Sequence, residues 1–191
     1  VMQGVHNNFD TDIFKKIMQA TQALSKHVPL TTQRIIADHM RAICWLIVDQ
    51  VRPSNEGRGY VLRRIIRRAL RFAFSAQMEI PCLYKLVDVV IDEYSFDPHM
   101  CSEQATIIEV LRTEETLFSH TIRNGIAMFE QSLVDAQDNT IAGNVVFKLH
   151  DTFGFPHDLV VDLAKEKGFN VDLDGYEHAM AAQKSRSRQH Q

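Results

Sequence analysis

Residues 61–72 hold the sequence feature that most restricts how this chain can fold, because arginines and apolar residues follow one another at a helical spacing. With about 100° of rotation per residue, the arginines occupy one arc of a helix and the apolar side chains occupy the rest. The apolar side must be buried against other elements, and we expect the arginine side to face solvent or a polyanion. The arginines on that side are Arg63, Arg64, Arg67, Arg68 and Arg71.

Positive charge is concentrated around this predicted helix. From Arg52 to Arg71 there are seven arginines and one acid, Glu56, whereas the whole chain has 21 basic and 24 acidic side chains and a net charge of −3. The segment therefore carries +6 and the rest of the chain −9. Arginine grips phosphate with a planar fork and stacks on bases, so the pattern favours contact with RNA. The alternative is a solvated helix face balanced by acidic neighbours, but arginines four residues apart repel one another without an interleaved acid.

A short polar segment, residues 54–59, precedes the arginine helix and contains Gly57, Arg58 and Gly59. Glycine adopts positive φ readily and lets backbone N–H groups approach a ligand, and the N-terminus of the following helix favours an anion. An ordinary loop between helices is the alternative, because Pro-Ser-Asn is common in turns. We expect Arg58 to join the five helical arginines in contacting a phosphate backbone.

The remainder of the chain repeats apolar residues at helical intervals and shows no stretch that alternates well enough for a sheet. The predicted fold is all-α and multihelical, with two helical subdomains that meet near Asp97. Residues 135–143 form a hinge. Besides the arginine helix, helices are expected over about 10–24, 31–50, 82–94 and 102–136, in a short segment reaching residue 150, over 156–168, and from residue 172 or 174 onward.

Composition excludes several classes of protein. The three cysteines, Cys44, Cys82 and Cys101, form no C-x-x-C pair, which indicates reduced thiols in a cytoplasmic protein and no zinc site. No apolar run is long enough to cross a membrane. We find no catalytic Ser/His/Asp arrangement and no phosphate-binding G-x-x-x-x-G-K-[ST] loop. The chain begins with Val1 and ends in polar sequence, which indicates a fragment of a longer protein.

Two long motifs resemble signatures of the alanyl-tRNA synthetase family of class II aminoacyl-tRNA synthetases. They are residues 53–69, Pro-Ser-Asn-Glu-Gly-Arg-Gly-Tyr-Val-Leu-Arg-Arg-Ile-Ile-Arg-Arg-Ala, and residues 149–156, Leu-His-Asp-Thr-Phe-Gly-Phe-Pro. Residues 8–14 and 112–115 are also similar to that family. The resemblance covers essentially the whole chain. It implies the helical tRNA-recognition region that follows the catalytic domain.

The resemblance also implies roles for two residues. Asn55 and Asp151 match the family's asparagine and aspartate that read the G·U pair of the tRNA acceptor stem. A wobble pair leaves the guanine amine unpaired in the shallow minor groove of A-form RNA, where side chains reach it. A carboxylate only accepts hydrogen bonds, whereas an amide both donates and accepts. Without the resemblance, a structural Asx-turn or helix N-cap would be the ordinary reading of Asp151.

The family's activity implies partners and cofactors that lie outside this chain. Such enzymes activate alanine with ATP and Mg²⁺ and attach it to tRNA, and their editing domain holds zinc. By the resemblance, residues 1–9 end the upstream catalytic domain, residues 10–97 form the first subdomain and residues 98–191 the second, followed by the editing domain. We expect no catalytic residue, cofactor or metal in this fragment, which is inactive alone. A general RNA- or DNA-binding module and a helical protein-interaction domain remain as alternatives.

Overall fold

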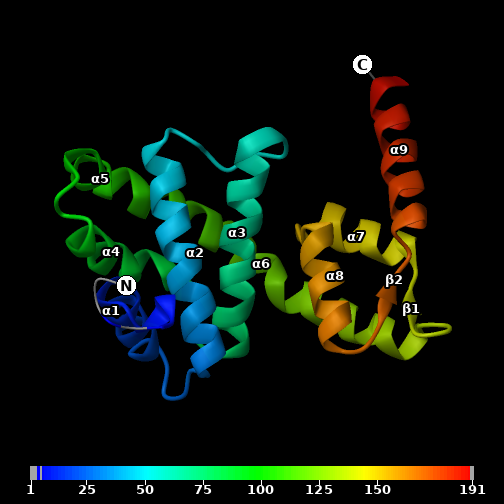
Figure 1. Ribbon diagram of the computed structural model, residues 1–191. Helices are drawn as coiled ribbons and strands as arrows, with labels where there is room; N and C mark the ends of the chain where they lie inside the picture. Colours follow the sequence, from blue (N-terminus) through cyan, green and yellow to red (C-terminus); the bar gives the residue numbers. More distant parts are fainter. Residues whose placement is uncertain (1–3, 5, 190–191) are drawn as a thin grey trace. The chain divides into compact units, whose positions relative to one another are not determined.

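The computed structural model describes residue 4 and residues 6–189, and its main elements are α-helices, which confirms the predicted all-α class (Figure 1). Of the predicted upstream segment 1–9, residues 1–3 and 5 lie outside this description. In the described part, the α-helices are α1 (Asp12–Gln22), α2 (Leu30–Val48), α3 (Gly57–Ser75), α4 (Val87–Glu93), α5 (Pro98–Ser102), α6 (Gln104–Asp135), α7 (Gly143–Phe153), α8 (His157–Glu166) and α9 (Leu173–Gln189). Two 3-10 helices, η1 (Asn8–Asp10) and η2 (Leu83–Leu86), and two strands, β1 (Thr140–Ile141) and β2 (Asn170–Val171), complete them. No described helix has the length and apolar character needed to span a membrane.

The chain divides into two compact units, Val1–Ser119 and His120–Gln191, so the division falls within α6 and not at the predicted boundary near Asp97. The turn at Asp97 is a helix cap. Its Oδ1 accepts hydrogen bonds from the backbone N–H groups of His99 (2.8 Å) and Met100 (3.1 Å), and Pro98 occupies the first turn of α5. The sequence analysis did not predict this short helix.

In the first unit, α2 and α3 lie side by side, and the loop that joins them lies at one end of both helices (Figure 1). Both helices bury apolar residues spaced three and four apart. Those of α2 include Ile36, Met40, Ile43 and Ile47, and those of α3 include Leu62, Ile66, Ala69 and Leu70, all with 0% exposure. The predicted amphipathic pattern therefore builds the core of this unit.

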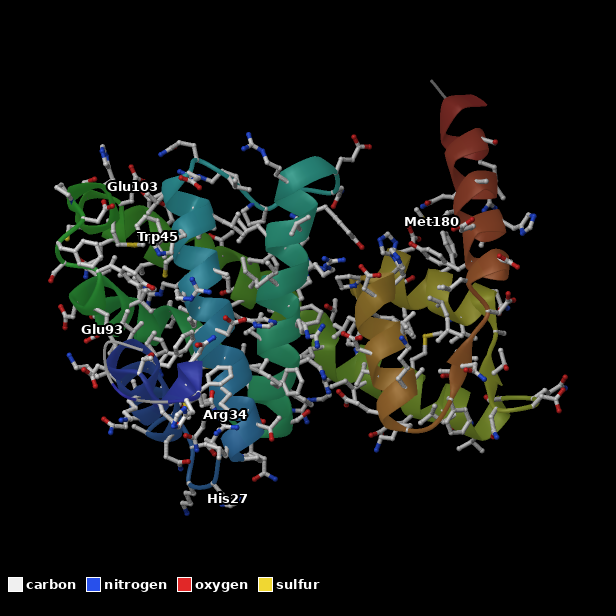
Figure 2. All side chains as sticks on the ribbon, viewed as in Figure 1. His27, Arg34, Trp45, Glu93, Glu103 and Met180 are labelled. Atoms are coloured by element: carbon white, nitrogen blue, oxygen red, sulfur yellow. The ribbon has the colours of Figure 1, made fainter. Side chains whose placement is uncertain are left out.

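A second contact of the first unit joins α2 to α4. The ring of Trp45 meets Tyr94 edge to face with centroids 5.3 Å apart, and Glu93 pairs with Lys16 of α1. Trp45 and Glu93 are labelled in Figure 2. The helix predicted over residues 82–94 begins as the 3-10 turn η2 and becomes α-helical only at Val87.

The second unit holds α7, α8 and α9 and the short parallel pair β1 and β2, in which Thr140 is opposite Asn170. The sequence analysis missed this pairing because two residues are too few to alternate visibly. A Cβ added to Gly143 in α7 would collide with the backbone of Gly175 and Tyr176 in α9. Glycine at position 143 therefore permits the close packing of α7 on α9.

Candidate nucleic-acid interface

Gly57 and Gly59 shape the junction between the loop and α3. Gly57 has a φ of +59°, and a Cβ on Gly59 would collide with the carbonyl oxygen of Arg52 and with Ser54. The hydroxyl of Ser54 donates a hydrogen bond to the carbonyl oxygen of Glu56 at 2.8 Å. Both glycines lie in the first turn of α3, and not in a loop that precedes the helix. Asn55, in the loop that precedes this turn, is exposed.

Asn55 is held by an arginine of α3. Its Oδ1 accepts a hydrogen bond from Nη1 of Arg63, which lies two turns into the helix. Arg58 is exposed in the first turn of the same helix, close to Asn55 in sequence. The structure thus groups a predicted base-reading side chain with a predicted phosphate-binding side chain at one end of α3.

The arginine side of α3 differs from the solvent-facing surface that the sequence predicts. Glu114 of α6, 3% exposed, lies between Arg63 and Arg67. Its Oε1 is 3.1 Å from Nε of Arg63, 2.7 Å from Nε of Arg67 and 2.6 Å from Nη2 of Arg67. This acid supplies the counter-charge that α3 lacks in its own sequence. Burial lowers the pKa of Arg67, and the charge of Glu114 opposes that shift.

Besides the exposed Arg58, three further arginines of α3 differ in exposure. Arg71 is only 4% exposed and its guanidinium carbon is 3.8 Å from the centroid of the Phe72 ring, so it packs within the unit. Arg64 and Arg68 are half-buried. The predicted uniform stripe is therefore graded, from exposed Arg58 at the start of the helix to buried Arg71 near its end.

Asp151 lies in the last turn of α7, and not in the inter-helix turn that the sequence predicts. The helix ends at Gly154, which has a φ of +68° and whose N–H donates to the carbonyl oxygen of His150 at 3.2 Å. A carboxylate at the C-terminal end of a helix is disfavoured by the helix dipole. The N-cap of the next helix is Pro156, so Asp151 does not serve as that cap.

The carboxylate of Asp151 is exposed and accepts one hydrogen bond at Oδ1 from Nε2 of Gln183 in α9, at 2.6 Å. Asn55 and Asp151 belong to different compact units. In both cases an exposed polar group is oriented by a neighbouring side chain. Helical periodicity did not reveal these neighbours, Arg63 and Gln183, because each pair depends on how separate elements pack.

The described residues do not form a site for a metal. No group of three His, Cys, Asp or Glu side chains among them is arranged to hold an ion. Burial raises the pKa of the Cys44 and Cys82 thiols to about 12, which leaves both thiols protonated and unreactive. The residues of this chain that the structure describes therefore do not fit zinc.

Comparison with known proteins identifies the family. The family model described as "tRNA synthetases class II (A)" matches residues 1–191. Alanine-tRNA ligase of Nitrosococcus oceani is 44% identical over 191 residues, which cover 98% of this chain and 22% of that protein. The same enzyme from Coxiella burnetii, strain Dugway, is 42% identical over 192 residues, or 99% of this chain and 22% of the relative.

A third relative matches this chain over a similar share of both proteins. Alanine-tRNA ligase of Dichelobacter nodosus is 44% identical over 191 residues, which cover 98% of this chain and 22% of the relative. The chain thus spans about a fifth of the length of the curated relatives it matches. The family model and these identities agree with the two motifs at residues 53–69 and 149–156. The chain belongs to the alanyl-tRNA synthetase family of class II tRNA synthetases.

Proposed function

We propose that this chain is the part of an alanine-tRNA ligase that selects tRNA by the G·U pair of the acceptor stem. The observation that carries the proposal is the exposed Asn55, held by Arg63 at the end of a basic helix and followed closely by the exposed Arg58. A directional side chain beside phosphate-binding cations is the combination that reads a base pair while gripping the backbone.

Asp151 contributes the second directional contact in this proposal. Its carboxylate is exposed, only accepts hydrogen bonds, and lies where the dipole of α7 disfavours it. Neither its helix nor the next one gains a cap from it, which supports a role outside folding. Arg58, Arg64 and Arg68 grip the phosphate backbone, while the partly buried Arg63 and Arg67 and the buried Arg71 supply positive potential.

The same proposal assigns the activity of the whole protein. The protein that contains this chain activates alanine with ATP and Mg²⁺ and attaches it to its tRNA in the cytoplasm. Other domains of that protein, including a zinc-containing editing domain, supply chemistry that this chain lacks. Within that protein this chain contributes selection of the RNA.

The test is a titration of the chain with two acceptor-stem duplexes that differ only in a G·U or a G·C pair, at fixed salt. Asn55→Ala and Asp151→Ala should each remove most of the preference for G·U, because each deletes a contact worth about 1–3 kcal/mol of discrimination. Affinity for the G·C duplex should change little.

Matched controls exist in the chain. Asp88 is exposed and accepts a hydrogen bond from Gln104 at 2.8 Å, as Asp151 does from Gln183, and Asn124 is an exposed asparagine. Asp88→Ala and Asn124→Ala should leave the preference intact. Equal affinity of the unsubstituted chain for both duplexes would contradict the proposal and favour a general RNA-binding module. The absence of any RNA binding would favour an acidic protein partner.

A further inference from the structure

Glu114 is a buried acid that joins α6 to the arginine helix. Its Oε1 lies within 3.1 Å of Nε of Arg63 and within 2.7 Å of Nε of Arg67. Only 3% of its side chain is exposed, so these contacts are poorly screened by water. Two arginines that repel each other therefore share one counter-charge at a defined place.

Arg63 carries this arrangement to the surface. Oε1 of Glu114 forms an ion pair with Arg63 at 3.1 Å, and Nε itself has no hydrogen bond of ordinary geometry. The guanidinium group is planar and rigid, so the charge of Glu114 restricts where the two Nη groups lie. Nη1 donates to Oδ1 of Asn55. The arginine is 21% exposed, less than expected of a side chain that extends into solvent toward RNA. Arg63 thus lies between the acid Glu114 and the amide of Asn55, and it connects the packing of α3 on α6 to the loop before α3.

The link determines which end of the Asn55 amide faces outward. A guanidinium group has only donors, so it can meet the amide only at its oxygen. With Oδ1 engaged by Arg63, the NH₂ group and the remaining lone pair of the oxygen are left for a ligand. Without Arg63, the amide of Asn55 would rotate freely and present either its oxygen or its NH₂ group to the RNA. The preference for G·U over G·C would then be smaller.

We propose that Glu114 is a positioning residue for base-pair recognition, which it serves by orienting Asn55 through Arg63. This inference rests on the proposed function, because it assigns a cause to the selectivity of Asn55. It also gives Arg63 a role different from the phosphate contact expected from its sequence pattern. Glu114 itself touches no RNA.

The first test measures the G·U preference of three variants. Glu114→Gln removes the charge that holds Arg63, Arg63→Lys keeps a positive charge without the planar fork, and Glu114→Asp keeps the acid on a shorter stem. The first two should reduce the ratio of the two dissociation constants by about tenfold, as loss of a charge-assisted contact predicts. Glu114→Asp should retain part of the preference. Glu109→Gln, at an exposed site of the same helix, is the matched control and should retain all of it.

A double substitution separates positioning from general support of the fold. If Glu114 acts through Asn55, then Asn55→Ala with Glu114→Gln should show no greater loss of preference than Asn55→Ala alone. Additive losses would overturn the inference. Because removal of the Glu114 charge takes a counter-charge away from two partly buried arginines, thermal unfolding and circular dichroism should be recorded for every variant. The readout is the ratio of the two affinities, because a uniform loss of folded protein does not change that ratio.

The second test does not depend on RNA. The side-chain NH₂ resonances of Asn55 in an NMR spectrum of the free chain should shift in Glu114→Gln and Arg63→Lys and stay unchanged in Glu109→Gln. Unshifted resonances in the first two variants would overturn the inference even if the chain prefers G·U. Shifted resonances in a chain without any G·U preference would leave the orientation intact while the proposed function fails, and the role in recognition would fall with it.

Discussion

Glu115 is a carboxylic acid with no exposed surface, next to Glu114 on α6. Burial raises its pKa to about 7, partly offset by the backbone N–H groups of Leu83, Cys82 and Tyr84 at the start of η2. Neither carboxylate oxygen has a hydrogen bond of ordinary geometry. The acid thus faces the N-terminus of a 3-10 helix, whose free amides favour the charged carboxylate. Burial opposes this effect, because desolvation favours the neutral acid.

Stability should therefore depend on the protonation of Glu115. Its pKa is higher in the folded state, about 7, than in the unfolded state, 4.5, so the folded chain binds the proton more tightly. The free energy of unfolding should fall as the pH rises from 4.5 to 7 and then level off. Glu115→Gln keeps the shape of the side chain without its charge. The difference in unfolding free energy between this variant and the unsubstituted chain should therefore shift in favour of the variant by roughly 2–3 kcal/mol between pH 4.5 and pH 8. Urea unfolding at a series of pH values measures this difference.

His39 makes the comparison with the variant necessary. Burial and the charge of Arg68 lower the pKa of His39, so its contribution to stability is lost as the pH falls below its ordinary value of 6.5. That change has the opposite sign to the one from Glu115 in an overlapping range of pH. Because both proteins contain His39, its contribution cancels in the difference. Identical pH profiles for the two proteins would contradict the assignment to Glu115.

Gly59 offers a second test at the scale of one residue. A Cβ at this position would collide with the carbonyl oxygen of Arg52. A backbone atom cannot move aside as easily as the end of a flexible side chain. Gly59→Ala should destabilise the chain by about 1–3 kcal/mol, and it should reduce the G·U preference because Asn55 lies in the loop immediately before this helical turn. Ser75→Ala, at an exposed position near the end of α3, is the control in thermal unfolding. An unchanged melting temperature would show that the loop adapts to the added methyl group.

At the scale of elements, α6 has a glycine in its interior where helix propensity disfavours it by about 1 kcal/mol. The glycine is Gly125, and a Cβ there would collide with the ring of Phe155, which is fully buried just after α7 ends. Phe155, which belongs to the second motif, therefore packs the segment after α7 against Gly125 of α6. Through this contact the motif also fixes the helix that carries Asp151.

The contact predicts a pair of compensating substitutions. Gly125→Ala should destabilise the second unit by about 1–3 kcal/mol, because the ring of Phe155 must move. Phe155→Leu creates room, so the double variant should be less unstable than the sum of the two single variants. Chemical denaturation of the four proteins gives the interaction energy. Strict additivity would show that the collision is relieved elsewhere.

At the scale of the whole chain, a net charge of −3 conceals a segment of +6, so binding to a polyanion should depend on salt. The triple variant Arg58→Gln, Arg64→Gln, Arg68→Gln should weaken binding to G·U and G·C duplexes equally. The slope of log affinity against log salt should become shallower by about 2–3, close to one for each lost phosphate contact.

A control with the same change in net charge tests whether location matters. Lys15, Lys26 and Lys165 are exposed and lie outside the arginine helix, and their replacement by Gln should leave the slope nearly unchanged. Equal effects of both triple variants would indicate that total charge, and not this surface, governs binding. A change in G·U preference in the arginine variant would assign base reading to these side chains.

Most of the helices could be predicted from the sequence, because the apolar spacing that defines a helix is local and repeats within a few residues. The bounds expected for α1, α2 and α6 differ from the observed ones by at most a few residues. The capped helix α5 and the strands β1 and β2 were missed, since five and two residues are too short for a period to appear. The two motifs were sufficient to identify the family.

The sequence by itself determined the helical class and the basic segment, and it singled out Asn55 and Asp151 as candidate RNA-reading residues. Only the tertiary structure decided which arginines are buried and what holds each polar side chain. Glu114 is 47 residues from Arg67, and Gln183 is 32 residues from Asp151. Helical periodicity contains no information about such pairs, because they form only when separate helices pack and water leaves the contact. The sequence therefore contains the counter-charge of α3, Glu114 of α6, but does not identify it as the partner of the arginines.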